Sequence, residues 1–577
     1  MFFKKTLPSN LLVLLTTITL TSTFLTACNP SSQNTPPEST STTPEEDTLK
    51  LLYWQAPTIL NPHLATGFKD YEGARIIYEP LASLDQKGDF VPFLAAEIPS
   101  EENGGLSEDG KSVTWKLRQG VKWSDGTPFT AQDVVFTYEF ISNPEVAATT
   151  TANYAGIDKV EALDEHTVKI TFQQPQPAWY SPFTGQNGMI LPEHIFAEYN
   201  GINVREAPAN LKPVGTGPYQ VVEFKPGDVM VLEPNELYWD EGKPYFNRVE
   251  LKGGGDATSA ARAVLQTGDA DFAYNLQVEA NILQKLEAAG KGKVVTVFGG
   301  DVERIMINFT DPQRGSEVEF PHPFFSDPRV RQAFTHTVDR DTIAQQLYGS
   351  TGVPTSQLLV APQELKSPKI SSEFNLKKAA DLLDEAGWQD TNGNGIRDKD
   401  GVEMKVVFAT SVNPVRQKTQ AIVKQALKSI GVDVELKSVD ASIFFGGDPS
   451  NPDTLNRFNF DLQEYTTGNE SPDPTAYMKQ WTCDEIAAEE NNWQKNNYAR
   501  YCNPEYDLLW EAASQELDPV QRSKLFQQMD ELLFQDAAVI PLIARADANG
   551  FSNRLQGINP TPWDASTWDI KNWQRKP

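Results

Sequence analysis

A strand, a long helix and a second strand follow one another between residues 404 and 440, and this unit restricts the possible folds most strongly. The runs MKVVFAT at 404–410 and VDVELKSV at 432–439 have the apolar, β-branched character of strands. The run PVRQKTQAIVKQALKSIG at 414–431 has helical spacing and ends at a glycine. A helix that joins two such strands forms a crossover connection, which makes the strands parallel. The sequence therefore predicts a mixed α/β fold.

The rest of the chain alternates in the same way and is too long for one hydrophobic core. A chain of 577 residues is expected to divide into two or three lobes. The strands predicted elsewhere lie at 49–54, 166–172, 219–224, 228–234 and 247–252, with an alternating hairpin at 112–126. The helices predicted elsewhere lie at 131–141, where Thr130 can serve as N-cap, and at 258–268, 327–348 and 376–387.

The N-terminus has the parts of a secretory signal that ends in a lipobox. Lys4 and Lys5 precede an apolar run at 11–20, which is shorter than the roughly 20 residues that a membrane-spanning helix needs. Small residues then lead to Cys28, as a cleavage site requires. We therefore expect residues 1–28 to be a lipoprotein signal peptide and Cys28 to be acylated after cleavage. A plain signal peptide or a free cysteine is the alternative.

The segment 29–47 contains proline, serine, threonine and acids, and nothing that could pack, so it predicts a flexible tether. A folded body that begins near Thr48 would then be anchored by lipid at the periplasmic or extracellular face of a membrane. Compartments reached by export are oxidising, so we predict a disulfide between Cys483 and Cys502. Two unpaired or metal-binding thiols are the alternative, but no CxxC motif or Cys/His cluster accompanies them.

The charge of the chain and its motifs exclude several classes of function. With 50 Lys and Arg against 78 Asp and Glu, the net charge of −28 repels nucleic acid and anionic lipid. The run 105–112 fits the phosphate-loop pattern, but two acids lie inside it and a strand follows it, so it predicts a β-turn. The five histidines are not paired at zinc spacing, and no Gly-x-Ser-x-Gly elbow is present. We expect neither an enzyme nor a cofactor.

One loop resembles the first nine positions of a calcium loop. Asp390, Asn392, Asn394 and Asp398 place oxygen side chains at alternate positions. Position twelve is Gly401 rather than the closing glutamate. The loop is therefore either a weak calcium site or a turn rich in glycine and asparagine.

The run VTWKLRQGVKWSDGTPFTAQDVVFTYEF at 113–140 closely resembles the hallmark of the bacterial extracellular solute-binding proteins of family 5, the dipeptide, oligopeptide and nickel binders. Further blocks of the chain match the same family, at 213–224, 327–340, 376–388 and 503–507. The resemblance extends from about residue 49 to about residue 543, which is nearly the whole mature chain.

The resemblance implies a periplasmic-binding-protein-like α/β fold of the cluster C type, with two lobes joined by a hinge and one inserted subdomain. Ligand would be enclosed at the lobe interface when the hinge closes. The boundaries carried over from the family are 48–78 with 212–299 and 539–577 for lobe I, 79–211 for the inserted subdomain, and 300–538 for lobe II.

In peptide binders of this family, an acidic side chain of lobe II pairs with the α-ammonium of the ligand, while main-chain groups form sheet-like hydrogen bonds with its backbone. The corresponding stretch here makes Glu470 and Asp473 competing candidates, and an Asp-Pro turn is the structural alternative for either. No basic residue is clearly positioned for a ligand carboxylate. The weaker candidates for ligand contact are Tyr53, Trp54, Tyr274, Asn275, Asn308 and Arg457.

The function implied by the resemblance is that of a monomeric, lipid-anchored receptor of an ABC importer. It would capture a peptide and deliver it to a membrane permease driven by cytoplasmic ATPases. Within the same fold the ligand could instead be a nickel chelate, haem, an opine or an oligosaccharide, because fold does not determine ligand. A surface signalling receptor without transport is a further alternative.

Overall fold

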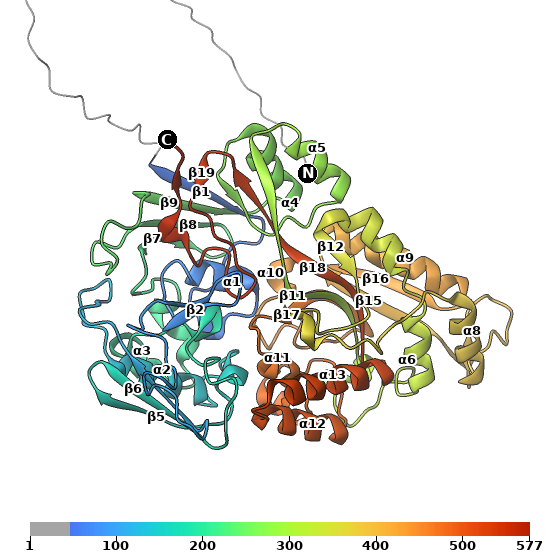
Figure 1. Cartoon of the computed structure of the whole chain (residues 1–577). Coiled ribbons are helices and arrows are strands. Elements are labelled where there is room, and N and C mark those ends of the chain that lie inside the picture. Colours follow the sequence, from blue (N-terminus) through green and yellow to red (C-terminus); the bar gives the residue numbers. More distant parts are fainter. Residues whose placement is uncertain (1–46) are drawn as a thin grey trace, which may run out of the picture. The chain divides into compact units, whose positions relative to one another are not determined.

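One sheet of eleven strands runs through residues 47–577, which are the residues that the computed structural model describes (Figure 1). The eleventh strand, β12 (Gly352–Pro354), pairs with β18 beside the main path. The spatial order of the other ten is β16 (Asp433–Val439), β15 (Lys405–Ser411), β17 (Leu462–Asn469), β11 (Gly292–Ile307), β18 (Val539–Ser552), β10 (Phe272–Ala273), β1 (Thr48–Tyr53), β9 (Arg248–Gly253), β8 (Val229–Pro234) and β7 (Tyr219–Lys225).

The predicted crossover is confirmed. Strands β15 and β16 are parallel, with Lys405 opposite Asp433, and the helix α9 (Pro414–Ser429) connects them. Asn413 caps this helix, because its side-chain oxygen accepts hydrogen bonds from the backbone of the first helical turn. Parallel pairs also join β1 to β9 and to β10, so the sheet is mixed.

Two long antiparallel strands, β11 and β18, join the two halves of the sheet, as Figure 1 shows. We call the strands β7 to β10 with β1 half I, and the strands β15 to β17 half II. The register of β11 against β18 shifts between Phe298 and Val302, which is an irregularity in the middle of both strands. The boundary expected at 299 and 300 therefore falls inside β11, and the one expected at 538 and 539 falls at the start of β18.

The segment 79–211 forms a small sheet of its own, but the hairpin predicted at 112–126 is wrong. Strand β4 (Ser112–Lys116) pairs with β6 (Thr167–Phe172), far along the chain, because the alternating apolar positions of both strands face one core. The neighbouring run 105–112 is a turn, as predicted, with Leu106 bridging to Val113. The other elements here are β2 (Ala82–Leu84), β3 (Phe90–Pro92), β5 (Ile157–Asp164), α2 (Ala131–Ser142) and α3 (Glu193–Phe196).

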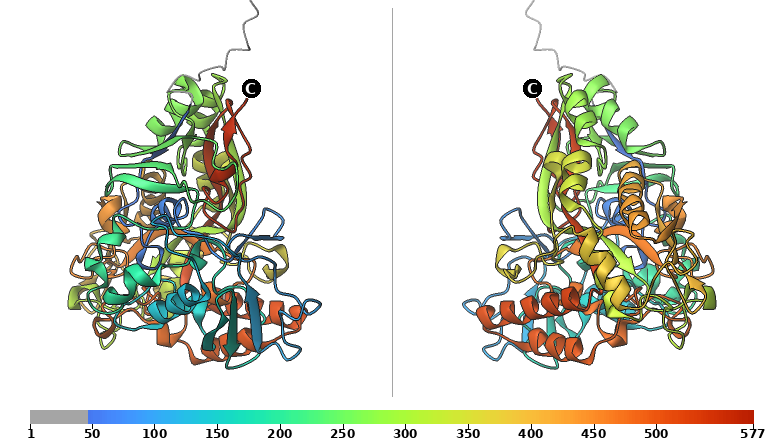
Figure 2. Two further views of the ribbon diagram at one scale, coloured as in Figure 1. Left: turned by 90° about the vertical axis from the view of Figure 1, so that its left-hand side faces the viewer. Right: turned by 90° about the vertical axis from the view of Figure 1, so that its right-hand side faces the viewer.

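Helices cover both halves of the sheet. Beside half I lie α1 (Phe68–Ala74), α4 (Ala257–Arg262) and α5 (Ala280–Glu287). Beside half II lie α6 (Pro328–Thr335), α7 (Arg340–Ile343), α8 (Leu376–Glu385), α10 (Ala441–Phe444), α11 (Thr475–Lys479), α12 (Pro504–Gln515) and α13 (Pro519–Gln535). Figure 2 shows α12 and α13 lying side by side.

The single helix predicted at 327–348 is broken into α6 and α7. Asp339 accepts a hydrogen bond from the backbone nitrogen of Thr342 and so caps a second helix. Such local side-chain hydrogen bonds compete with a continuous helix. The predicted N-cap at Thr130 is confirmed, because its hydroxyl accepts a hydrogen bond from the backbone nitrogen of Gln132.

The hydrophobic core of half I is shared with the segment 79–211. Residues of both, such as Leu51 and Trp115, belong to one continuous buried cluster. The C-terminal end of the chain returns to this cluster, where Trp573 packs its ring against Phe272 and Phe551. Trp573 thus packs the C-terminal segment onto this core. Two further short sheets are β13 (Asp398–Lys399) with β14 (Val402–Glu403), and β19 (Leu555–Gln556) with β20 (Gln574–Arg575).

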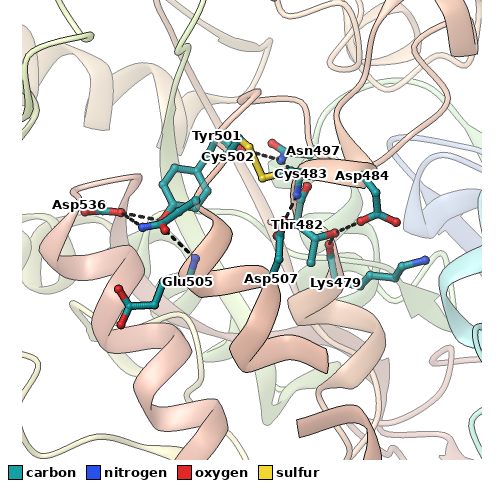
Figure 3. Close-up of a disulfide and its surroundings, with 11 residues drawn as sticks. Lys479, Thr482, Cys483, Asp484, Asn497, Tyr501, Cys502, Glu505, Asp507 and Asp536 are labelled. Carbon is teal, nitrogen blue, oxygen red and sulfur yellow. Dashed lines mark hydrogen bonds between the residues drawn. A yellow bond between two sulfur atoms is a disulfide. The ribbon is translucent and has the colours of Figure 1, made fainter. Parts of the chain in front are cut away.

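The predicted disulfide is present and ties the segment before α12 to the segment after α11 (Figure 3). Cys483 and Cys502 are bonded, and the backbone nitrogen of Cys483 donates to the carboxylate of Asp507 at 3.0 Å. The amide nitrogen of Asn497 donates to the carbonyls of Thr482 and Tyr501, one residue before each cysteine. Hydrogen bonds and the covalent bond therefore hold the same two segments together.

Candidate functional site

A cavity of about 230 Å³ lies between half I, half II and the segment 79–211. Most of its lining residues come from four stretches of the chain, 65–71, 149–153, 274–277 and 465–480, and single residues such as Asn187, Arg416 and Arg545 complete the wall. Pockets of this kind, enclosed between parts of a protein and lined by both apolar and polar groups, are the usual sites for small ligands.

Glu470 lines this cavity and comes directly after the last residue of β17. One carboxylate oxygen accepts a hydrogen bond of 2.7 Å from the side-chain amide of Asn187, which belongs to the segment 79–211. Burial raises the pKa of Glu470 to about 7, although the amides of Gln186 and Asn187 oppose this rise. The carboxylate therefore lacks a cationic partner in the ligand-free protein.

Asp473, the competing candidate, is occupied by the protein itself. One of its oxygens forms an ion pair with the guanidinium of Arg522, which comes from α13. The other accepts the backbone nitrogen of Thr475 at 2.9 Å and so starts α11. The side chain is buried and lines the cavity, but its charge is already neutralised.

Four of the weaker candidates for ligand contact belong to half I. Two of them line the cavity, and the other two lie behind those two. Tyr274 and Asn275 line the cavity, and Asn275 accepts a hydrogen bond of 2.8 Å from Arg545. Tyr53 stacks on the ring of Tyr274 with centroids 4.7 Å apart. Trp54 donates its indole nitrogen to the carbonyl of Asn275 at 2.9 Å. Tyr53 and Trp54 are not among the lining residues, and both support the two that are.

The remaining two candidates, Asn308 and Arg457, are also not among the residues that line the cavity. Asn308 is fully buried, and its amide nitrogen donates to the carbonyls of Phe458 and Phe460. Arg457 stacks its guanidinium over the ring of Trp493 at 3.6 Å. Both side chains fix the loop before β17, and ligand contact by either stays a prediction.

The loop at 390–398 keeps its oxygens for its own backbone. Asp390 accepts the backbone nitrogens of Gly393, Asn394 and Gly395, and Asp398 accepts the backbone nitrogen and hydroxyl of Thr391. Asn392 and Asn394 accept further backbone nitrogens within the loop. Within residues 47–577, no group of three or more His, Cys, Asp or Glu is arranged to hold a metal ion. The local geometry is that of consecutive Asx turns, and calcium binding stays an untested prediction.

The backbone of β17 has a free edge where it borders the cavity. Residues 462–464 pair with β15 on one side and with β11 on the other. Residues 465–469 pair with β11 alone, so the groups of their other edge have no strand partner. An extended chain laid along this edge could add a strand to the sheet.

The sequence matches the family model described as "Bacterial extracellular solute-binding proteins, family 5 Middle" over residues 89–488. The chain belongs to this family. The family 5 match covers most of the folded body and includes the stretch with Glu470, so the resemblance seen in the sequence is confirmed.

Known relatives of this family 5 protein match it over nearly its whole length. The oligopeptide-binding protein AppA of Bacillus subtilis (strain 168) is 29% identical over 572 residues, covering 97% of this chain and 98% of that protein. The solved structure of AppA in complex with a nonapeptide has a TM-score of 0.79 at 27% identity, over 92% of this chain and 99% of that one. NikZ of Campylobacter jejuni, solved in complex with Ni(L-His), has a TM-score of 0.77 at 24% identity, covering 92% and 100%, and shows the fold.

Three basic side chains of this family 5 protein line the cavity, although no cation was clearly positioned from the sequence. Lys69, Arg416 and Arg545 all face it. Each is paired with a carboxylate of the protein, Lys69 with Asp70 at 2.6 Å and Arg416 with Glu303 at 2.7 Å. Their place in the cavity follows from long-range packing, so no local motif could have revealed them.

No helix within 47–577 is long and apolar enough to cross a membrane.

Proposed function

We propose that this chain is the substrate-binding protein of an ABC importer and that it binds peptides in the cavity between its lobes. The observation that carries the proposal is the buried carboxylate of Glu470, which faces the cavity without a cationic partner beside a free strand edge. The relative AppA is named for oligopeptide binding, and its solved structure holds a nonapeptide. An ammonium group and an extended backbone are the two features that such a site would recognise.

In this proposal, the α-ammonium of the peptide pairs with Glu470, and its first peptide units pair with the free edge of residues 465–469. A charge-assisted hydrogen bond inside a protein is about twice as strong as a neutral one, so the ammonium sets the register of the peptide. Main-chain pairing is independent of side chains, which lets one site accept many sequences. Asp473 is not assigned to the ligand, because Arg522 already neutralises it.

The lobes of the proposal are those expected from the sequence, with lobe I at 48–78, 212–299 and 539–577, the inserted subdomain at 79–211 and lobe II at 300–538. We place the hinge at the register shift of β11 between Phe298 and Val302, where two strands alone connect the halves of the sheet. Ligand would favour the closed arrangement, because only that arrangement contacts the peptide from both lobes.

The wider setting of the proposal comes from the N-terminal signal. Cys28 would carry the lipid that anchors the chain at the outer face of a membrane, and 29–47 would be the tether. Cys28 and residues 29–46 lie outside the described residues. The closed monomer would dock on a permease served by cytoplasmic ATPases, and the protein itself would catalyse no reaction.

Native mass spectrometry of residues 29–577, which leave out the lipid-bearing Cys28, tests the proposal. The protein is measured as purified and after incubation with a mixed library of dipeptides to hexapeptides. We expect retained peptides with free amino termini, and we expect Glu470→Gln to lose them while Glu101→Gln, on the surface, retains them. A folded protein that retains no peptide would overturn the proposal and direct the search to chelates, opines or sugars.

A further inference from the structure

A second, smaller cavity of about 60 Å³ adjoins the first. Five residues line both cavities, Phe68, Tyr274, Asn469, Glu470 and Arg545. The carboxylate of Glu470 thus stands at the junction. The second cavity extends from there between α1, the middle of β11 and β18, and the C-terminal stretch 561–565.

Five acidic side chains line this second cavity, which the proposed peptide contacts do not explain. Apart from Glu470 they are Glu72, Asp301, Asp547 and Asp564. Among the described residues that line it, Arg545 is the only basic one. The wall therefore holds more negative charge than its own cation can balance.

Two of these acids already have their hydrogen-bonding needs met. Asp564 pairs with Arg75 at 3.1 Å and accepts the hydroxyl of Ser83. Glu72 accepts the hydroxyl of Tyr53 on one oxygen and the backbone nitrogen of Ser566 on the other. Asp564 thus has a cation, whereas Glu72 has neutral donors on both oxygens, and burial together with the charge of Asp547 raises its pKa to about 8.

Asp301 and Asp547 are the other two acids that line the second cavity. Asp301 meets Arg545 only at 3.5 Å, and Asp547 accepts neutral donors, the amide of Asn549 and the hydroxyl of Ser566, on one oxygen. Burial raises the pKa of both carboxyls, and the charge of Asp301 raises the pKa of Asp547 further. A second cation between them would remove this repulsion.

An unpartnered donor marks the same wall as a place for a ligand. Asn469 is 3% exposed, and its amide nitrogen has no hydrogen-bond partner in the protein. It lines both cavities next to Glu470. Unsatisfied buried donors are rare in proteins, and this one would suit the first carbonyl oxygen of a peptide whose ammonium is held by Glu470.

We propose that the second cavity binds the side chain of the first residue of the peptide and selects a cation, lysine or arginine, through Asp301 and Asp547. This inference rests on the proposed function. The α-ammonium and the side chain of the first residue are bonded to the same α-carbon. An α-ammonium held at the junction by Glu470 therefore brings that side chain to the entrance of the second cavity.

The size of the second cavity and the arrangement of its carboxylates agree with an elongated organic cation. The volume has room for about four to six water-sized groups, and a lysine side chain is four methylenes and an ammonium. A metal ion would need several carboxylates around one point, and no such group exists within residues 47–577.

Calorimetric titration with pentapeptides that differ only in their first residue tests the inference. Lysine is compared with norleucine, which has a similar length and no charge, and with alanine and glutamate, always before the same tetra-alanine tail. We expect the lysine peptide to bind about tenfold or more tightly than the norleucine peptide, and the glutamate peptide to bind most weakly.

Asp547→Asn and Asp301→Asn should reduce this ratio toward one while leaving the affinity for the norleucine peptide nearly unchanged. Asp158→Asn, on the surface, should keep the ratio. Equal affinity of the wild-type protein for the lysine and norleucine peptides overturns the inference, even if a variant fails to fold. Binding of none of the peptides would instead overturn the proposed function and this inference with it.

Discussion

The side-chain amide of Asn187 donates a hydrogen bond of 2.7 Å to the carboxylate of Glu470. This contact joins the segment 79–211 to the end of β17, so it connects two parts of the molecule at the wall of the cavity. A neutral donor is a weak partner for a buried carboxylate, which is why the pKa of Glu470 stays raised to about 7.

Replacement of Glu470 by glutamine should weaken peptide binding while leaving the protein folded. The amide is of the same size and can still accept the hydrogen bond from Asn187. Loss of the charged partner should weaken binding by about 1.5 to 3 kcal/mol, because that is the range for hydrogen bonds to charged groups. Calorimetric titration with a free-amine peptide and with its acetylated form measures this, and equal binding of both forms to the wild type would contradict it.

Peptide affinity should be greatest near neutral pH. The pKa of Glu470 is raised to about 7, so below this pH a proton must leave before an ammonium can pair. The dissociation constant should therefore rise as pH falls, by up to about tenfold per unit. Above about pH 8 the peptide amine loses its own proton and affinity should fall again. Titrations across this range should show the maximum, and a profile that is flat from acidic to neutral pH would exclude Glu470.

The ligand-free Glu470→Gln variant should be more stable than the wild type above about pH 7. A carboxyl whose pKa rises from 4.5 to about 7 on folding makes the folded state bind more protons than the unfolded state between these values. Stability is therefore lost as pH rises through this window, and glutamine avoids the loss, by about 1 to 3 kcal/mol. Urea unfolding at acidic and at mildly alkaline pH measures it. An advantage that does not grow with pH would contradict the reasoning.

Replacement of Asp473 by asparagine should destabilise the protein. The ion pair with Arg522 is largely buried, and removing one partner leaves an uncompensated charge. Such losses cost about 3 to 5 kcal/mol. Thermal unfolding of Asp473→Asn beside the surface control Asp158→Asn should show a lower melting temperature for the first alone. An unchanged melting temperature together with lost peptide binding would move the role of ammonium partner from Glu470 to Asp473.

Removal of the disulfide should lower stability through the unfolded chain. Cys483 and Cys502 are 19 residues apart, and closing a loop of about this length contributes about 3 kcal/mol. The double variant Cys483→Ser, Cys502→Ser should therefore unfold at lower urea concentration, and reduction of the wild type should reproduce the change. Coincident unfolding curves for the oxidised and reduced wild type would show that the bond adds nothing.

Local patterns in the sequence predicted those elements whose stabilising contacts are also local. The crossover from β15 through α9 to β16 is an example, because apolar spacing and the turn glycine lie within one short stretch. The pairing of β4 with β6 could not be predicted in this way, since an alternating strand has the same pattern whichever partner it finds. The break before α7 was missed because a capping aspartate competed with a long helical run.

The candidate site shows the same difference between what local sequence reveals and what long-range contacts decide. The acids at 470 and 473 were found from the sequence, because the family resemblance points to that stretch of the chain. Their different states depend on Arg522 and Asn187, which are 49 and 283 residues away from the acids that they contact. No spacing rule connects positions so far apart.

By itself, the sequence determined the family, the α/β class and the pair of cysteines, because each depends on residues close together or on a resemblance along the whole chain. The tertiary structure alone decided that Asp473 has a cationic partner and Glu470 has none. It also brought Asp301 and Asp547 to one cavity wall, from strands that are adjacent in the sheet but distant in the chain. Burial and charge are properties of such assembled surfaces, so they exist only once the fold has formed.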